Sequence, residues 1–175
     1  MMPIPSHLRD RVAPLDSIID EKPLVAAVQC PCGERGFQFL YPGQTDVYNG
    51  RTIPCTAEID GRYFFLVVAR CVTCSKDNLL LDVDFHGWNG FICHDDEQAT
   101  LPRPDLTAWP CEACGHLAHT GVVTIQTEGR HDFITEVGDE FDAEQWPDGF
   151  GWFSMSLTCR HCNLTSAELV SCETM

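Results

Sequence analysis

Cys71-Val-Thr-Cys74 and Cys159-Arg-His-Cys162 are two of four short segments that decide the fold of this 175-residue chain; the others are Cys30-Pro-Cys-Gly33 and Cys111-Glu-Ala-Cys-Gly115. Close thiol pairs on tight turns are the ligands that a tetrahedral zinc ion takes two at a time. The spacing therefore predicts two four-thiolate sites and two Zn²⁺ per chain, bound by Cys30, Cys32, Cys71, Cys74, Cys111, Cys114, Cys159 and Cys162.

Each pair is expected to lie on a turn, or knuckle. Gly33 and Gly115 follow the first and third pairs, where a residue with positive φ lets backbone amides point at the thiolates. No glycine follows the second or the fourth pair, and Cys-Pro-Cys has one residue between its thiols instead of two. Closure within each half of the chain is the natural partition, and an interleaved partition (first pair with third, second with fourth) is the alternative.

The order of the pairs indicates an internal duplication, because a pair, about forty residues and a second pair occur twice. The four knuckles resemble zinc ribbons, in which two knuckles on β-hairpins hold one metal ion. That resemblance covers the knuckles and the strands beside them, and it implies a fold shared by proteins of many functions.

The chain is predicted to be mainly β with little helix, in two tandem zinc-ribbon-like antiparallel sheet units. We expect an N-terminal arm at 1–29, a first repeat at 30–94, a linker at 95–108 and a second repeat at 109–175. Apolar alternation favours strands at 79–85 and 153–158, and an apolar run at 62–70 predicts a central strand. Residues 121–127 and 131–137 are interpreted as a hairpin around Glu128-Gly129-Arg130.

Disulfides are the main alternative for the paired thiols, but they need an oxidising compartment. Residues 1–12 lack the apolar core of a secretory signal, so we expect a cytoplasmic protein with reduced thiols. Cys55, Cys93 and Cys172 are unpaired in sequence, and we expect buried or incidental thiols there. No apolar stretch approaches the length that a membrane helix needs, which predicts no membrane partner.

The acidic charge lies in the second part of the chain: residues 1–75 hold seven basic and eight acidic residues, and 76–175 hold four and 18. Such a surface repels phosphate backbones, so we expect no nucleic-acid partner. The densest acidic run has no basic residue within it, and an exposed tryptophan is expected beside it. These residues form the predicted contact with a basic protein partner: Glu136, Asp139, Glu140, Asp142, Glu144, Trp146 and Asp148.

Little in the sequence indicates an enzyme. A site with four cysteines is closed, whereas a catalytic zinc keeps a position open for water or substrate. A histidine beside a knuckle (His116, His119 or His161) is the alternative ligand that would change this. Cys93, followed by His94, Asp95 and Asp96, has the parts of a thiol-dependent site, but neighbours on a strand point to opposite faces.

The sequence thus favours a non-enzymatic, acidic zinc-binding protein that binds a basic protein, with an inhibitor or immunity-type protein as the most specific version. A zinc-stabilised adaptor and a thiol-dependent enzyme at Cys93 are the alternatives. Acidic charge can also serve solubility alone. The tryptophans could line a ligand groove, although such residues more often fill the core of a small sheet.

Overall fold

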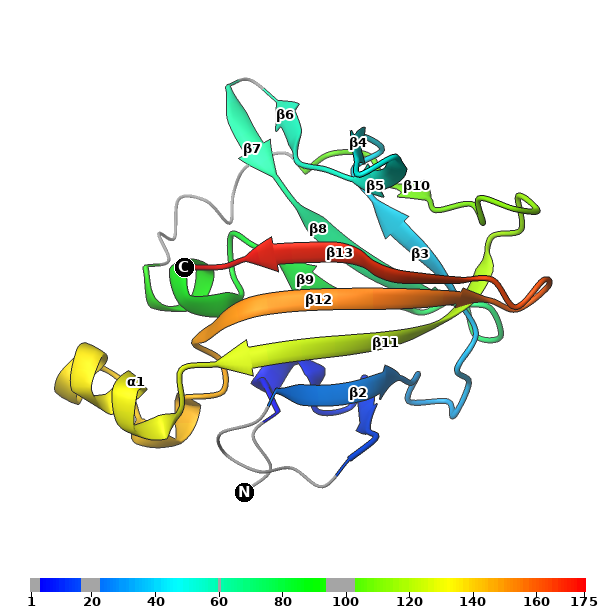
Figure 1. Ribbon diagram of the computed structural model, residues 1–175. Helices are drawn as coiled ribbons and strands as arrows, with labels where there is room; N and C mark the ends of the chain where they lie inside the picture. Colours follow the sequence, from blue (N-terminus) through cyan, green and yellow to red (C-terminus); the bar gives the residue numbers. More distant parts are fainter. Residues whose placement is uncertain (1–3, 17–22, 60, 94–102) are drawn as a thin grey trace.

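The computed structural model describes residues 4–16, 23–59, 61–93 and 103–175, and in these residues the protein is mainly β (Figure 1). The predicted fold class is confirmed. The strands are β1 (Val12–Pro14), β2 (Leu24–Val28), β3 (Phe37–Tyr41), β4 (Thr45–Tyr48), β5 (Arg51–Pro54), β6 (Ala57–Ile59), β7 (Arg62–Phe64), β8 (Leu66–Cys71), β9 (Asp77–Asp82), β10 (Thr107–Ala108), β11 (Ala118–Thr127), β12 (Phe150–Cys159) and β13 (Thr165–Glu173).

The described helical elements are short. They comprise the α-helix α1 (Arg130–Val137), a π-helix, and three 3₁₀ turns: Trp88–Ile92 for the π-helix and Ser6–Leu8, Gly138–Glu140 and Ala143–Gln145 for the turns. In the described residues no helix is long and apolar enough to cross a membrane.

Nine strands form one curled sheet, to which each predicted repeat contributes a three-stranded antiparallel meander. The first is β3-β8-β9 and the second is β11-β12-β13. They join where the start of β11 pairs with the start of β3, at Ala118 and His119 opposite Gln38 and Phe37. The two units therefore lie in one sheet. The element order matches the predicted duplication, but a common origin by duplication stays a prediction.

The N-terminal strands join the second meander. β1 pairs with β2, and β2 pairs with β11 from Leu24 opposite Ile125 to Ala27 opposite Val122. The first knuckle leaves the sheet between β2 and β3, and both of these strands lie along the same edge of β11.

Side chains from both meanders share one core. Phe37 and Leu80 come from the first unit, Phe153 and Leu157 from the second, and Leu8 from the N-terminal arm; all are fully or almost fully buried in one cluster. Burial of apolar surface is the main favourable term in folding, so neither unit has a complete core of its own.

The predicted strand at 131–137 is wrong, because Arg130–Val137 forms α1. Phe133 and Val137 lie one helical turn apart and are buried against Trp146 in a second small cluster. β11 ends at Thr127 and pairs with β12 instead of forming the predicted hairpin. The 3₁₀ turn Ala143–Gln145 follows, with a capping box formed by Asp142 and Gln145.

Candidate metal centres

The eight paired cysteines gather into two clusters of four, and each cluster comes from one half of the chain. Cys30, Cys32, Cys71 and Cys74 form centre 1, and Cys111, Cys114, Cys159 and Cys162 form centre 2; within each centre all sulfurs lie within 4.8 Å of one another. Closure within each half is confirmed, and the interleaved partition is wrong.

The sulfur separations fit a zinc ion. In centre 1 the Sγ atoms of Cys30 and Cys74 are 3.5 Å apart and those of Cys32 and Cys71 are 3.6 Å apart. Centre 2 has the same pair of values, 3.5 Å for Cys111 to Cys162 and 3.6 Å for Cys114 to Cys159. Four sulfurs around a zinc ion at about 2.3 Å lie about 3.8 Å from one another, whereas a disulfide requires about 2.05 Å. The donor set therefore fits two Zn²⁺ per chain.

The four knuckles have closely similar backbone hydrogen bonds. In three of them the first cysteine donates its N–H to the carbonyl oxygen five residues on, at Lys76, His116 and Leu164. Cys30 donates to Glu34, four residues on. The shorter Cys-Pro-Cys spacing is thus absorbed by a turn that is one residue shorter, and the four thiols still converge.

The residue after each pair has positive φ. Gly33 has φ 89° and Gly115 has φ 71°, and Ser75 (φ 58°) and Asn163 (φ 60°) occupy the same place in the knuckles without glycine. Each of the four donates its backbone N–H to the carbonyl oxygen of the first cysteine of its pair. Ser and Asn therefore adopt the left-handed conformation that the sequence analysis associated with glycine alone.

Backbone amides also act on the thiols of centre 2. The amide of Cys162, and then that of His161, lowers the pKa of Cys159 to about 6. The N–H of His161 lies 3.4 Å from this sulfur. A lowered thiol pKa favours the thiolate that binds metal. In centre 1, burial raises the pKa of Cys30 to about 12.

No histidine joins either described cluster. His116 and His161 stack on each other with ring centroids 4.1 Å apart, and His119 is buried and bonded through Nδ1 to the carbonyl oxygen of Leu117. Both centres have four thiol donors, so they are closed sites of the kind that stabilise a fold.

The two centres lie at one end of the sheet and α1 at the other (Figure 1). An ion pair links the fourth knuckle to the first: Nη1 of Arg160 lies 3.2 Å from Oε1 of Glu34. Arg160 also packs against Gly36 so closely that any Cβ there would collide with it.

The predicted partner-binding residues separate into two groups. Glu136, Asp139, Glu140, Asp142 and Glu144 are exposed. Trp146 and Asp148 are only 7% exposed. The expectation of an exposed Trp146 is wrong, since this ring fills the cluster with Phe133. Asp148 accepts a hydrogen bond from the backbone N–H of Ser6.

The exposed acids have some local partners. Arg130 lies 3.1 Å from Glu144, both side chains being about half exposed. Asp142 accepts from the N–H of Glu144 at 2.9 Å. Glu144 and Asp142 therefore help to hold the segment, whereas Glu136, Asp139 and Glu140 lie on its exposed side.

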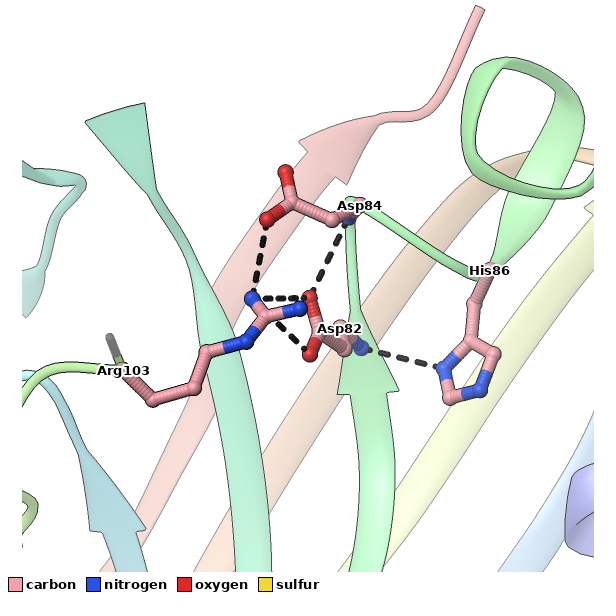
Figure 2. A network of polar contacts seen from close by, with 4 residues as sticks. All are labelled: Asp82, Asp84, His86 and Arg103. Carbon is pink, nitrogen blue, oxygen red and sulfur yellow. Dashed lines mark hydrogen bonds and ion pairs between the residues drawn. The ribbon is translucent and has the colours of Figure 1, made fainter. Parts of the chain in front are cut away.

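A partly buried ionic network, not predicted from the sequence, lies at the end of β9 (Figure 2). Nη1 of Arg103 is 2.8 Å from Asp84 and 3.2 Å from Asp82, and its guanidinium covers the ring of Phe85 at 4.7 Å. Burial raises the pKa of Asp82, and the charge of Arg103 opposes that rise. The only signal in the sequence was Asp82 and Asp84 on the polar face of a strand.

The same network reaches the N-terminal arm. The N–H of Asp82 donates to Nδ1 of His86 at 3.0 Å, and the rings of His86 and His7 stack with centroids 3.6 Å apart. Burial lowers the pKa of His7 to about 4 and that of His86 to about 3, so both rings are neutral near pH 7. The stacked pair fixes the turn Ser6–Leu8 against the end of β9.

Cys93 is exposed at the end of the π-helix, where its N–H donates to the carbonyl oxygen of Asn89. His94, Asp95 and Asp96 lie outside the described residues, so a thiol-dependent site there stays a prediction. Cys55 and Cys172 are partly buried and contribute to one large cavity, a long-range arrangement that sequence spacing cannot show.

Comparison with known proteins found no matching family model, no matching curated relative and no matching solved structure.

Proposed function

We propose that this zinc-binding protein is a non-enzymatic scaffold whose acidic segment, 136–144, binds a basic protein partner. The observation that carries the proposal is the exposure of five carboxylates on one short segment, Glu136, Asp139, Glu140, Asp142 and Glu144. A concentrated patch of one sign raises the association rate with a partner of the opposite sign. An inhibitor or immunity-type protein, which covers a basic active site, is the most specific form of this proposal.

The position of the segment supports this role. It lies between the end of β11 and the start of β12, away from the knuckles (Figure 1). The buried cluster of Phe133, Val137 and Trp146 packs beneath the segment and supports the backbone that carries the carboxylates. Closed centres leave the zinc ions a structural role, and reduced thiolates fit a reducing compartment such as the cytoplasm.

The test is charge reversal at Glu136, Asp139 and Glu140, which leaves the cap at Asp142 and the Arg130–Glu144 pair intact. A matched control reverses three exposed acids elsewhere, Asp46, Glu58 and Glu112, with the same change in net charge. The wild-type protein and both variants are used to capture partners from the native cell lysate, and association rates of the captured protein are then measured against salt concentration.

We expect the segment variant to associate at least tenfold more slowly and with a weaker dependence on salt, because steering by exposed charge acts mainly on the association rate. The control variant keeps most of the wild-type rate. A wild-type association rate for the segment variant would refute the segment as the contact. Slowing of both variants to the same extent would also refute it, because net charge alone would then be responsible. Zinc content is measured throughout and should stay at two ions per chain.

A further inference from the structure

A cavity of about 800 Å³ runs along β13. Five residues of its lining come from this strand, between Glu168 and Glu173, and belong to both faces of it. Because side chains alternate between faces along a strand, a cavity lined from both faces lies along the strand's edge. The β4–β5 hairpin, through Tyr48, Arg51 and Ile53, forms another wall.

In the described residues no strand is hydrogen-bonded to that edge of β13, although β5 packs near its beginning. Within the described residues β13 pairs with β12 alone. Thr174 donates its N–H to the carbonyl oxygen of Gly151. Hydrogen-bonded and non-hydrogen-bonded pairs alternate in an antiparallel ladder, so Ser171 and Glu173, opposite Ser154 and Trp152, direct their N–H and C=O groups away from β12. Both residues line the cavity, where these groups are available to a further strand.

The regular edge has a defined beginning. Glu168 has φ 47°, and its N–H donates to Oγ of Ser156 at the register shift between Met155 and Leu157. Just before it, Arg51 donates to the carbonyl oxygen of Ala167 at 2.9 Å. The open edge therefore extends over residues 169–173, a length of about 17 Å at about 3.4 Å per residue.

The two sides of the cavity differ in chemistry. Phe65, Val83 and Cys172 face it from the side of the main core. On the outer face Glu173 lies directly opposite Trp152, a residue that is 40% exposed. Tyr48 and Tyr63, about two-thirds exposed, stand at the rim. A segment in this place would meet apolar groups with one face, and a carboxylate and aromatic rings with the other.

We propose that this edge binds an extended, basic segment of a partner protein, which adds to β13 as an antiparallel strand of about five residues. Its inward side chains are apolar, and its outward side chains are lysine or arginine beside Glu173 and the ring of Trp152. Arg51 keeps its charge when it donates to the carbonyl oxygen of Ala167, but the lining also holds Glu168 and Glu173, so two carboxylates face one cation. This site is separate from segment 136–144 and does not depend on the function proposed for it.

The probe is the blocked heptapeptide acetyl-Lys-Val-Lys-Val-Lys-Val-Lys-amide, with affinity read from the fluorescence of the tryptophans and from calorimetry. Ser171→Pro removes the outward N–H of an edge residue and keeps the β12 ladder. Ser171→Ala, the matched control, keeps that N–H. We expect binding at least tenfold weaker in Ser171→Pro and within twofold of wild type in Ser171→Ala, with zinc content unchanged.

A second measurement needs no variant of the protein. Two versions of the peptide carry the same charge, one N-methylated on its lysines and the other on its valines. In an antiparallel register, the peptide residues opposite Ser171 and Glu173 have their side chains on the same outer face as those two residues. These peptide residues are the lysines, and their backbone N–H groups point to β13. Methylation of the lysines should weaken binding at least tenfold, and methylation of the valines should not. Absence of peptide binding, or equal affinity of the two peptides, would overturn the proposal.

Discussion

The β3-β8-β9 and β11-β12-β13 meanders are alike at their zinc ends and different at their other ends. Each begins after a knuckle, has its second strand enter another knuckle, and returns with a third strand. The same register places Phe37 opposite Cys71 in the first meander and His119 opposite Cys159 in the second. The N–H groups of Val72 and Arg160 also donate to equivalent carbonyl oxygens, those of Gly36 and Ala118.

The insertions between the first and second strands differ. The first meander carries the β4–β5 and β6–β7 hairpins, and the second carries α1 and two 3₁₀ turns with the exposed acids. The third strands also end differently. The end of β9 is closed by Arg103 on Asp82 and Asp84, whereas the outer edge of β13 borders a cavity at Glu173.

The proposed contacts lie where the two meanders differ. The zinc ends repeat one geometry and have closed metal sites. The features that could contact other molecules, segment 136–144 and the edge of β13, belong to the parts in which the two meanders differ. The comparison leads to three predictions, the first with the largest expected effect.

The largest effect is expected from loss of either metal centre. Cys71→Ser and Cys159→Ser each remove a buried ligand, and each should lower the zinc content below two ions per chain by native mass spectrometry. Structural zinc sites contribute about 10–16 kcal/mol in small peptides, which exceeds or matches the usual stability of about 5–15 kcal/mol for a domain. Because the two units share one core, either variant should lose cooperative folding of the whole chain, seen as loss of near-UV circular dichroism.

Cys93→Ser is the control for this prediction, since Cys93 is exposed and belongs to neither centre. It should keep two zinc ions and the wild-type unfolding transition. Two separate transitions in Cys71→Ser, with one half still folded, would show two independent domains and would contradict the shared core.

A smaller effect is expected where the third strands differ. Arg103→Met leaves the carboxylate of Asp82 buried without its cation, which should lower the free energy of unfolding at pH 7 by about 3–5 kcal/mol. Burial already raises the pKa of Asp82 above its ordinary value, and loss of Arg103 raises it further. Protonation then relieves the buried charge, so the deficit should shrink as the pH falls from 7 to 5.

The double variant Arg103→Met with Asp82→Asn serves as the control, because it removes both charges and should recover most of the lost stability. Glu173→Gln, at the corresponding place on β13, should change stability by less than about 1 kcal/mol since its side chain is exposed. A deficit for Arg103→Met that is constant with pH would contradict the assignment to Asp82. Urea unfolding in zinc-saturated buffer measures all three variants.

The sequence was sufficient for features that depend on local spacing. The partition of the thiols follows from pairs separated by one or two residues, and β12 follows from the alternation of Phe153, Met155 and Leu157 into Cys159. In both cases the chemistry of neighbouring residues determines the geometry. The same reasoning fails for Arg130–Val137, where β-branched residues such as Ile134 indicated a strand. Packing of Phe133 and Val137 on Trp146 makes it a helix.

The remaining features depend on contacts between distant residues. The pairing of β2 with β11, the network around Arg103, and the cavity that Cys55 and Cys172 share are all fixed by how the sheet curls. Non-local pairing leaves no periodic signal in one sequence. The burial of Trp146 was missed for the same reason, since its neighbours in sequence are acidic while its contacts come from α1.

The smallest predicted effect tests whether the knuckles are equivalent residue by residue. Gly115 and Asn163 both have positive φ, and a Cβ added at Gly115 would meet no atom within 4 Å. Gly115→Ala should therefore lower the free energy of unfolding by about 1–2 kcal/mol, which is the cost of placing alanine in the left-handed backbone conformation. Asn163→Gly should stabilise by up to about 1 kcal/mol, because glycine adopts that conformation without strain.

Gly33→Ala and Ser75→Gly are the matched substitutions in centre 1, where φ is also positive at both positions and the space around Gly33 is equally open. If the knuckles are equivalent, Gly33→Ala should lower the free energy of unfolding and Ser75→Gly should raise it. Unfolding at a fixed free zinc concentration measures all four variants, since release of zinc is part of the transition. Destabilisation by more than about 1 kcal/mol in Asn163→Gly, with stabilisation in Ser75→Gly, would mean that the Asn163 side chain supports centre 2 in a way that Ser75 does not support centre 1. The zinc-binding ends of the two meanders would then differ from each other, as their other ends do.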